Sequence, residues 1–171
     1  MATKIVVLNA GRIEQIRSPT QVYDNPASVF VASFVGAPPM NLVEGHLYSQ
    51  DGYVHADTCG ITAKLWRGDV EEHQIVMGVR PEHLRVSHAE SGAMRIEGVV
   101  ERVENLGSEQ VIYLRVDGQT IIAKDSRDVP LERGQYLALG ADLDAIHLFD
   151  KASGRRMEWV YDAAPELVGT H

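Results

Sequence analysis

Four neighbouring residues carry the most concentrated chemistry in this sequence: Arg80, Pro81, Glu82 and His83. A guanidinium, a carboxylate and an imidazole this close together can bind an anion, form an ion pair or move a proton. They follow the apolar run Ile75–Val79, so we expect them where a strand ends, with Pro81 fixing a turn. The sequence allows two interpretations of this motif: a site that carries out chemistry, or an ion pair of Arg80 with Glu82 or another acidic residue. We favour a structural role, in which the motif holds the crossing between two halves of a β-domain.

The sequence gives less support for a metal site or a reactive cysteine than for the Arg80–His83 motif. The chain has one cysteine, Cys59, which excludes an intramolecular disulfide and which we expect to be a small buried residue near a strand. No two histidines combine a zinc-ligand spacing with a position on a helix, so we predict no metal site. Glu101 and Glu104 are expected on a solvated face rather than as paired catalytic carboxylates. The seven histidines are His46, His55, His73, His83, His88, His147 and His171.

The printed sequence does not contain the motifs with which nucleotide-hydrolysing proteins bind phosphate and magnesium. A phosphate-cradling loop needs Gly-Lys-Ser/Thr, so that backbone amides and a lysine meet the phosphates. The lysines are followed by Ile, Leu, Asp and Ala, and no Asp-Glu pair ends an apolar strand to hold magnesium. We therefore predict that these residues bind no cofactor, neither ATP nor Mg²⁺, and have no catalytic site. The lysines are Lys4, Lys64, Lys124 and Lys151.

The composition of the chain limits the classes of partner that it can bind. Sixteen basic and 24 acidic residues among 171 give a net charge of −8, which disfavours binding to nucleic acid or to anionic lipid. Aromatic residues make up only 6%, few for a single-strand binder that stacks bases. No signal-peptide pattern or apolar run of about 18 residues occurs, so we predict no direct membrane insertion and a cytoplasmic chain that meets membranes through partner proteins.

The first 36 residues are expected to fold as a hairpin and two short helices. Ile5–Leu8 and Arg12–Ile16 flank the turn Asn9-Ala10-Gly11. Ser18-Pro19-Thr20-Gln21 predicts a capping box and a helix that stops before Pro26.

We expect the second helix to begin at Asn25-Pro26 and to end at Gly36, with Phe30 and Phe34 packed together in the core. Gly36-Ala37-Pro38-Pro39 cannot be helical and predicts a domain boundary.

Everything after the linker has the pattern of an all-β barrel or sandwich. The strands fall into two groups around Ser87–Ala93, which predicts two small barrel-like halves, and Gly98 inside a long strand predicts a bulge. The expected strands are Val43–Tyr48, Tyr53–Ala56, Ile61–Leu65, Ile75–Val79, Arg95–Val103, Glu109–Val116, Thr120–Ala123, Tyr136–Leu139 and Ala145–Phe149.

At this point the sequence resembles a known family, the ATP-binding subunits of carbohydrate-import ABC transporters. The resemblance extends over about residues 3–157, and Arg17 departs from it, since the family usually has glycine there. The segment Ala32–Leu42, with the sequence Ala-Ser-Phe-Val-Gly-Ala-Pro-Pro-Met-Asn-Leu, is most similar to the glycerol-3-phosphate branch of the family. The maltose-type branches are nearly as similar. The stretches that carry the resemblance are Ile5–Gln15, Asn25-Pro26-Ala27, Pro39–Leu42, Met77–His83 and His147–Asp150.

The resemblance implies that residues 1–36 are the end of an ATPase domain and 37–157 a regulatory β-domain. From Trp159 onward the strand pattern itself decays, so we expect 158–171 to be a loose tail. The resemblance implies a mainly β fold, a tandem barrel of the OB/MOP-like (TOBE) type. It also implies a homodimer through the β-domain, permease subunits as membrane partners and, in some members, a cytoplasmic regulatory protein. The intact subunit would hydrolyse ATP with Mg²⁺ and drive solute import. A free-standing, MOP-like barrel that binds small oxyanions stays an alternative.

Overall fold

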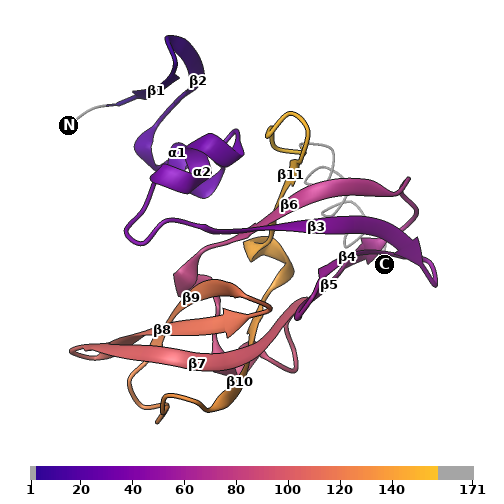
Figure 1. Cartoon of the computed structure of the whole chain (residues 1–171). Helices are drawn as coiled ribbons and strands as arrows, with labels where there is room; N and C mark the ends of the chain where they lie inside the picture. Colours follow the sequence, from indigo (N-terminus) through magenta and orange to yellow (C-terminus); the bar gives the residue numbers. More distant parts are fainter. Residues whose placement is uncertain (1–2, 158–171) are drawn as a thin grey trace.

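The computed structural model describes residues 3–157, and it begins with a hairpin followed by two short helices (Figure 1). Ala10 and Gly11 both have positive φ, 50° and 80°, which is the geometry of the tight turn that the sequence predicts. The elements of this segment are β1 (Ile5–Asn9), β2 (Arg12–Arg17), α1 (Pro19–Asp24) and α2 (Val29–Phe34).

Both helices begin at a serine cap. Ser18 caps α1, and the reciprocal contacts between Ser18 and Gln21 complete the predicted capping box. The second helix starts later than predicted: its cap is Ser28, whose side chain accepts from the Val31 amide, and not Asn25-Pro26. Asparagine could also cap a helix, but Asn25 ends α1 instead, where its backbone amide donates to the Gln21 carbonyl.

The rest of the described chain forms one nine-stranded antiparallel sheet that coils into two halves. Its order is β11-β6-β3-β4-β5-β7-β8-β9, with β10 paired to the other edge of β7. The strands are β3 (Asn41–Gln50), β4 (Tyr53–Thr58), β5 (Ile61–Arg67), β6 (His73–Val79), β7 (Met94–Leu106), β8 (Glu109–Val116), β9 (Gln119–Ser126), β10 (Tyr136–Ala141) and β11 (His147–Asp150). Single 3₁₀ turns lie at η1 (Pro81–His83), η2 (Val86–His88) and η3 (Leu143–Ala145).

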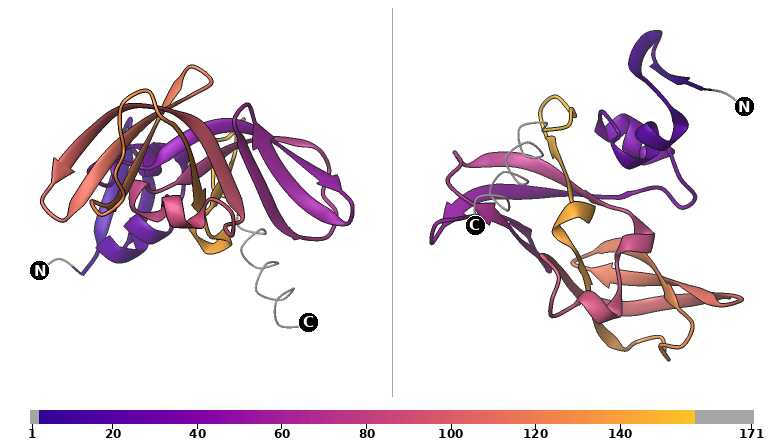
Figure 2. Two further views of the ribbon diagram at one scale, coloured as in Figure 1. Left: turned by 90° about the horizontal axis from the view of Figure 1, so that it is seen from below. Right: turned by 180° about the vertical axis from the view of Figure 1, so that it is seen from behind.

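The two predicted halves exist, but they are continuous. Residues 61–63 of β5 pair with 94–96 of β7, so one ladder joins the halves. The last strand also returns to the first half, because β11 pairs with β6. Figure 1 and the view from behind in Figure 2 show the hairpin and helices at one end of the molecule and β7–β9 at the opposite end.

The bulge predicted at Gly98 lies elsewhere in β7. The register shifts between Val100 and Arg102, so Glu101 is the extra residue. Gly98 is instead a point of close backbone approach, where an added Cβ would lie 2.3 Å from the Arg115 carbonyl oxygen. A glycine inside a strand can mark either feature, and sequence alone does not separate the two.

One large apolar core fills both halves of the β-domain, and a small one joins the helices to the hairpin through Val7, Val22 and Val31. Two predictions about burial were wrong. Cys59 is exposed, because it lies in the turn between β4 and β5. Phe30 packs against the small core, but Phe34 is 61% exposed even though the two rings lie 5.4 Å apart.

Candidate functional sites: an arginine junction and an arginine-lined groove

Arg80 lies where the helices meet the β-domain. It follows β6 directly and is 1% exposed, the largest fully buried side chain of the described residues. Its Nη1 donates to the Val35 carbonyl oxygen at 2.5 Å, and its Nη2 donates to the Tyr23 carbonyl oxygen at 2.7 Å. These carbonyls end α2 and α1, where helix geometry leaves carbonyl oxygens without partners. One cation therefore satisfies the carboxy-terminal ends of both helices.

Tyr23 and Glu82 complete this junction. The Arg80 guanidinium lies 4.0 Å from the centroid of the Tyr23 ring, and the Tyr23 hydroxyl donates to Glu82 Oε2. Burial, and then the hydrogen bond to Glu82, raise the pKa of Tyr23 to about 12. Burial acts to raise the pKa of Glu82, but the Tyr23 hydrogen bond and the nearby charges of His83 and Arg80 leave it below its usual value.

The four motif residues therefore do not converge on one cavity. Arg80 donates to backbone carbonyls rather than forming the suggested ion pair with Glu82, and Pro81 is buried at the start of η1. The His83 side chain is exposed, and only its backbone amide returns to the Arg80 carbonyl, at 3.0 Å. The contacts join the helices to the β-domain, whereas the sequence suggested a crossing between its two halves.

A second arginine, Arg156, holds the linker between the same two helices. Arg156 Nε donates to the Pro26 carbonyl at 2.8 Å, and the Arg156 amide donates to the Ala27 carbonyl at 3.0 Å. Its Nη2 lies 2.8 Å from Nδ1 of His147, the first residue of β11. A guanidinium only donates, so this nitrogen of His147 must be an unprotonated acceptor. Burial, and then the charges of Arg156, Arg80 and His83, lower the pKa of His147 to about 3.

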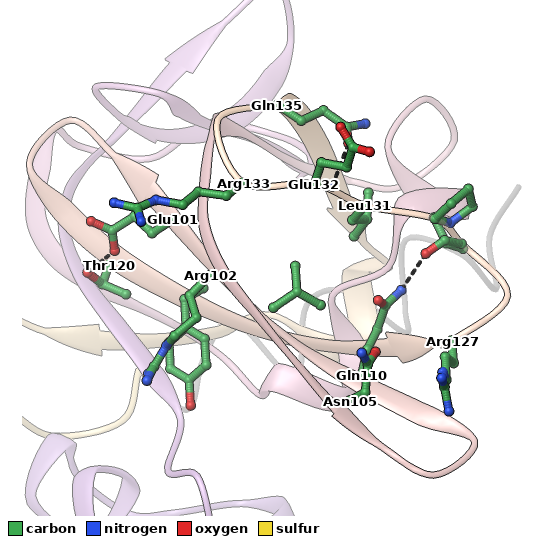
Figure 3. A pocket seen from close by; sticks show the side chains of 14 residues that line it. Glu101, Arg102, Asn105, Gln110, Thr120, Arg127, Leu131, Glu132, Arg133 and Gln135 are labelled. Carbon is green, nitrogen blue, oxygen red and sulfur yellow. Dashed lines mark hydrogen bonds between the residues drawn. The ribbon is translucent and has the colours of Figure 1, made fainter.

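The largest of the described hollows lies at the far end of the β-domain, among β7, β8 and the loop 127–135 (Figure 3). Its volume is about 1050 Å³, and three arginines, Arg102, Arg127 and Arg133, line it together with Glu101 and Glu132. We call it the β7–β8 groove. Residues 3–157 contain no group of three His, Cys, Asp or Glu side chains placed to hold a metal ion. No helix within that range is long and apolar enough to cross a membrane.

Two domain families match the β-domain of this chain. The TOBE domain profile matches residues 77–149, and the MalK OB fold domain profile matches residues 36–84. The sn-glycerol-3-phosphate import ATP-binding protein UgpC 2 of Rhizobium johnstonii is 34% identical over 160 residues, which is 92% of this chain and 42% of that protein. The chain belongs to the UgpC/MalK family of import ATP-binding proteins.

Two further relatives support the assignment. UgpC of Yersinia enterocolitica is 36% identical over 162 residues, covering 92% of this chain and 44% of that protein. The trehalose/maltose import ATP-binding protein MalK of Thermococcus litoralis is 36% identical over 169 residues, covering 91% of this chain and 44% of that protein. The chain thus spans less than half the length of these relatives.

A solved structure of the cytoplasmic molybdate-binding protein ModG is also similar, with a TM-score of 0.47 and 13% identity, covering 63% of this chain and 94% of that one. A likeness at this level says nothing about a ligand.

Of the three features described above, the Arg80 junction, Arg156 and the β7–β8 groove, the sequence pointed to the first and gave no clear sign of the other two. Sequence reasoning singled out Arg80 from the density of polar groups after an apolar strand. It missed Arg156, whose partner Pro26 is 130 residues away, and it missed the β7–β8 groove. A weak signal for the groove was available, because Arg127 and Arg133 bracket Pro130 in a segment without strand periodicity.

Proposed function

We propose that this chain is the regulatory and dimerising region of the ATP-binding subunit of an ABC importer for a sugar or for glycerol-3-phosphate. The names of the relatives support the transport class, and the TOBE and OB domains support the regulatory assignment. In this proposal the whole subunit is cytoplasmic, works with membrane-spanning permease subunits, and couples ATP hydrolysis with Mg²⁺ to import.

The observation that carries the proposal is the double arginine junction. The side chains of Arg80 and Arg156 hold the segment 19–35 on the β-domain through three backbone carbonyls, those of Tyr23, Val35 and Pro26. In the family resemblance, that segment ends the ATPase domain. A firm junction would let the β-domain transmit a force to an ATPase domain. A contact between the β-domains of two subunits would then keep those subunits close when nucleotide leaves.

Self-association through the β-domain has a surface available to it. Tyr136 of β10 pairs directly with Val99 of β7, and they are 65% and 42% exposed. A second apolar surface lies on the hairpin, where the cross-strand pairs Val6/Ile16 and Leu8/Ile13 are exposed. The proposal assigns the dimer to the first of these surfaces.

Light scattering at micromolar concentration tests this assignment. We expect a dimer for the unchanged chain, because two-fold self-association is the commonest oligomeric arrangement. Tyr136→Lys should give a monomer, whereas Ile13→Lys, an equal charge change on the hairpin, should leave the dimer intact. A monomeric unchanged chain would contradict the dimerising role. A dimer lost only in Ile13→Lys would move the contact to the hairpin.

A further inference from the structure

We propose that the β7–β8 groove docks an acidic, extended segment of a partner protein. The inference deepens the regulatory part of the proposed function and rests on it, since it gives a regulatory partner a binding surface and a chemistry. Dimerisation through Tyr136 is a separate property, so the two can fail independently.

Charge is the first argument. Three arginines line the groove in a chain whose net charge is −8, so the groove is locally unlike the rest of the surface. Of the two lining glutamates, Glu101 already has partners for its charge: Arg115 Nε donates to its Oε1 at 2.7 Å, and Thr120 donates to its Oε2 at 3.2 Å. The hydrogen bond from Arg115 also lowers the pKa of Glu101, so this carboxylate is charged and in use.

The arginines, by contrast, keep donors available. Arg102 lies over the Tyr113 ring, with Cζ 4.0 Å from the ring centroid, and meets one carboxylate, Glu104, at 3.2 Å. Arg127 donates only weakly, to the Gly107 carbonyl at 3.3 Å. Within residues 3–157, neither Arg127 nor Arg133 has a carboxylate at ion-pair distance. Guanidinium groups present paired donors that match a carboxylate, so the groove favours aspartate or glutamate side chains.

An apolar floor is the second argument. Val103 of β7 and Leu131 of the loop line the groove and are partly buried against the main core. Apolar atoms at the base with cations on the rim suit a segment that alternates acidic and apolar side chains, because the apolar ones lose water while the acids stay at the rim.

The walls are held in place before any ligand arrives. Gln110 is buried, and its Nε2 donates to the carbonyls of Ser126 and Val129 at 2.8 Å and 2.7 Å, which fixes the start of the loop. The Glu132 amide donates to Gln135 Oε1 at 3.1 Å and stabilises the far end (Figure 3). A groove built in advance loses less conformational entropy on binding.

The size of the groove favours a chain over a small molecule. Its volume of about 1050 Å³ is at or above the upper end of ordinary small-ligand pockets, roughly 300–1,000 Å³. A free small carboxylate would contact few of the three arginines at once, whereas an extended segment can pass along all of them. The segment would run between Arg133 and Arg127, with its apolar residue on Leu131.

A labelled peptide of about ten residues that alternates glutamate with leucine is the probe. Its fluorescence anisotropy would be measured against the full chain at low and at raised salt. We expect saturable binding that weakens with salt, because exposed charges are screened. Arg102→Gln/Arg133→Gln should weaken binding by about tenfold or more, since about 1.4 kcal/mol of lost interaction corresponds to a factor of ten. Arg127→Gln is an independent variant with the same expected direction.

The matched control is Arg12→Gln/Arg17→Gln, which removes the same charge from the hairpin and should bind like the unchanged chain. A peptide with glutamine in place of glutamate should bind at least about tenfold more weakly for the same reason. The proposal is overturned by no saturable binding up to millimolar chain, by equal loss in the control, or by equal binding of the glutamine peptide. Full displacement by citrate at equal carboxylate concentration would also overturn it, in favour of a site for small free carboxylates. Light scattering on the same variants would show whether dimerisation is intact.

Discussion

Asn41 of β3 and Ile122 of β9 join two strands that are not neighbours in the sheet through a pair of side chain–backbone hydrogen bonds. Asn41 Nδ2 donates to the Ile122 carbonyl at 2.7 Å, and the Ile122 amide donates to Asn41 Oδ1 at 2.8 Å. Asn41 opens β3 and Ile122 lies in β9, 81 residues later. The primary amide thus imitates one rung of a β-ladder where the backbones themselves do not pair.

Replacing Asn41 with alanine should therefore destabilise the β-domain as a whole. The Ile122 amide and carbonyl would lose their partners, and Asn41 Nδ2 would no longer meet the Val79 carbonyl, now 3.2 Å away. Leaving buried polar groups unpaired costs about 1–3 kcal/mol. Urea unfolding would measure the change, with the exposed Asn105→Ala as the control. Equal midpoints for the two variants would show that the rung contributes nothing.

The Arg80 junction makes a different prediction, because its loss should loosen one segment before it unfolds the chain. Arg80→Met keeps most of the side-chain length but removes both donors to the Tyr23 and Val35 carbonyls. Two hydrogen bonds from a charged donor contribute about 1.5–3 kcal/mol each.

Limited proteolysis should then cut Arg80→Met first within residues 24–40, whereas the unchanged chain should resist there. Arg85→Met, at an arginine whose nearest carboxylate is Asp125 at 3.9 Å, is the control. Early cleavage inside residues 95–140 instead would count against the junction and also against a boundary at residues 37–39.

Local elements were predictable where local chemistry decides them. The capping box of Ser18 and Gln21 and the turn at Ala10-Gly11 follow from side-chain donors and from tolerance of positive φ, both of which are visible in a few residues. The strands followed from period-two alternation, since one face of each lies in the core. The start of α2 was misplaced because Ser28 competes with Asn25-Pro26 as a cap, and only the fold decides between them.

Relationships over long sequence distances were not predictable in this way. Arg80 was chosen for its chemistry, but its partners Tyr23 and Val35 are 57 and 45 residues away. The pattern of a strand end gave no sign that two helix ends would meet there. The β7–β8 groove depends on an irregular loop whose path is fixed by Gln110, a single buried amide in β8. The described range ends at residue 157, so the tail predicted for 158–171 lies outside it.

The isolated chain should not bind Mg-ATP. Within the printed sequence no lysine stands before serine or threonine, and no acidic pair ends an apolar strand, so the groups that would contact phosphate and magnesium are absent. Isothermal titration calorimetry should give no heat beyond dilution, with a full-length UgpC-type relative as the positive control. Micromolar affinity would mean that this chain binds nucleotide by residues unlike those of a phosphate-cradling loop.

Stability should fall on mild acidification because of His147. Its pKa is about 3 in the folded chain against 6.5 for the free side chain, chiefly because it is buried. Below pH 6.5 the unfolded chain takes up a proton that the folded chain does not. The contribution of His147 is therefore complete above pH 6.5 and is lost progressively as the pH falls towards 3, with a slope of at most about 1.4 kcal/mol per pH unit.

Urea unfolding at pH 7.5, 6 and 5 would separate this effect from others. The free energy of unfolding of the unchanged chain should fall by about 1–2 kcal/mol from pH 7.5 to pH 5 because of His147, since only part of its titration lies within this range. His147→Gln keeps an acceptor for Arg156 and should lose less, whereas the half-buried control His55→Gln should behave like the unchanged chain. Asp150 does not confuse the comparison: hydrogen bonds from Ser153 and His73 lower its pKa from 3.8 to about 2, so its contribution is lost below about pH 4. If His147→Gln keeps the full pH dependence, the buried imidazole is not its source.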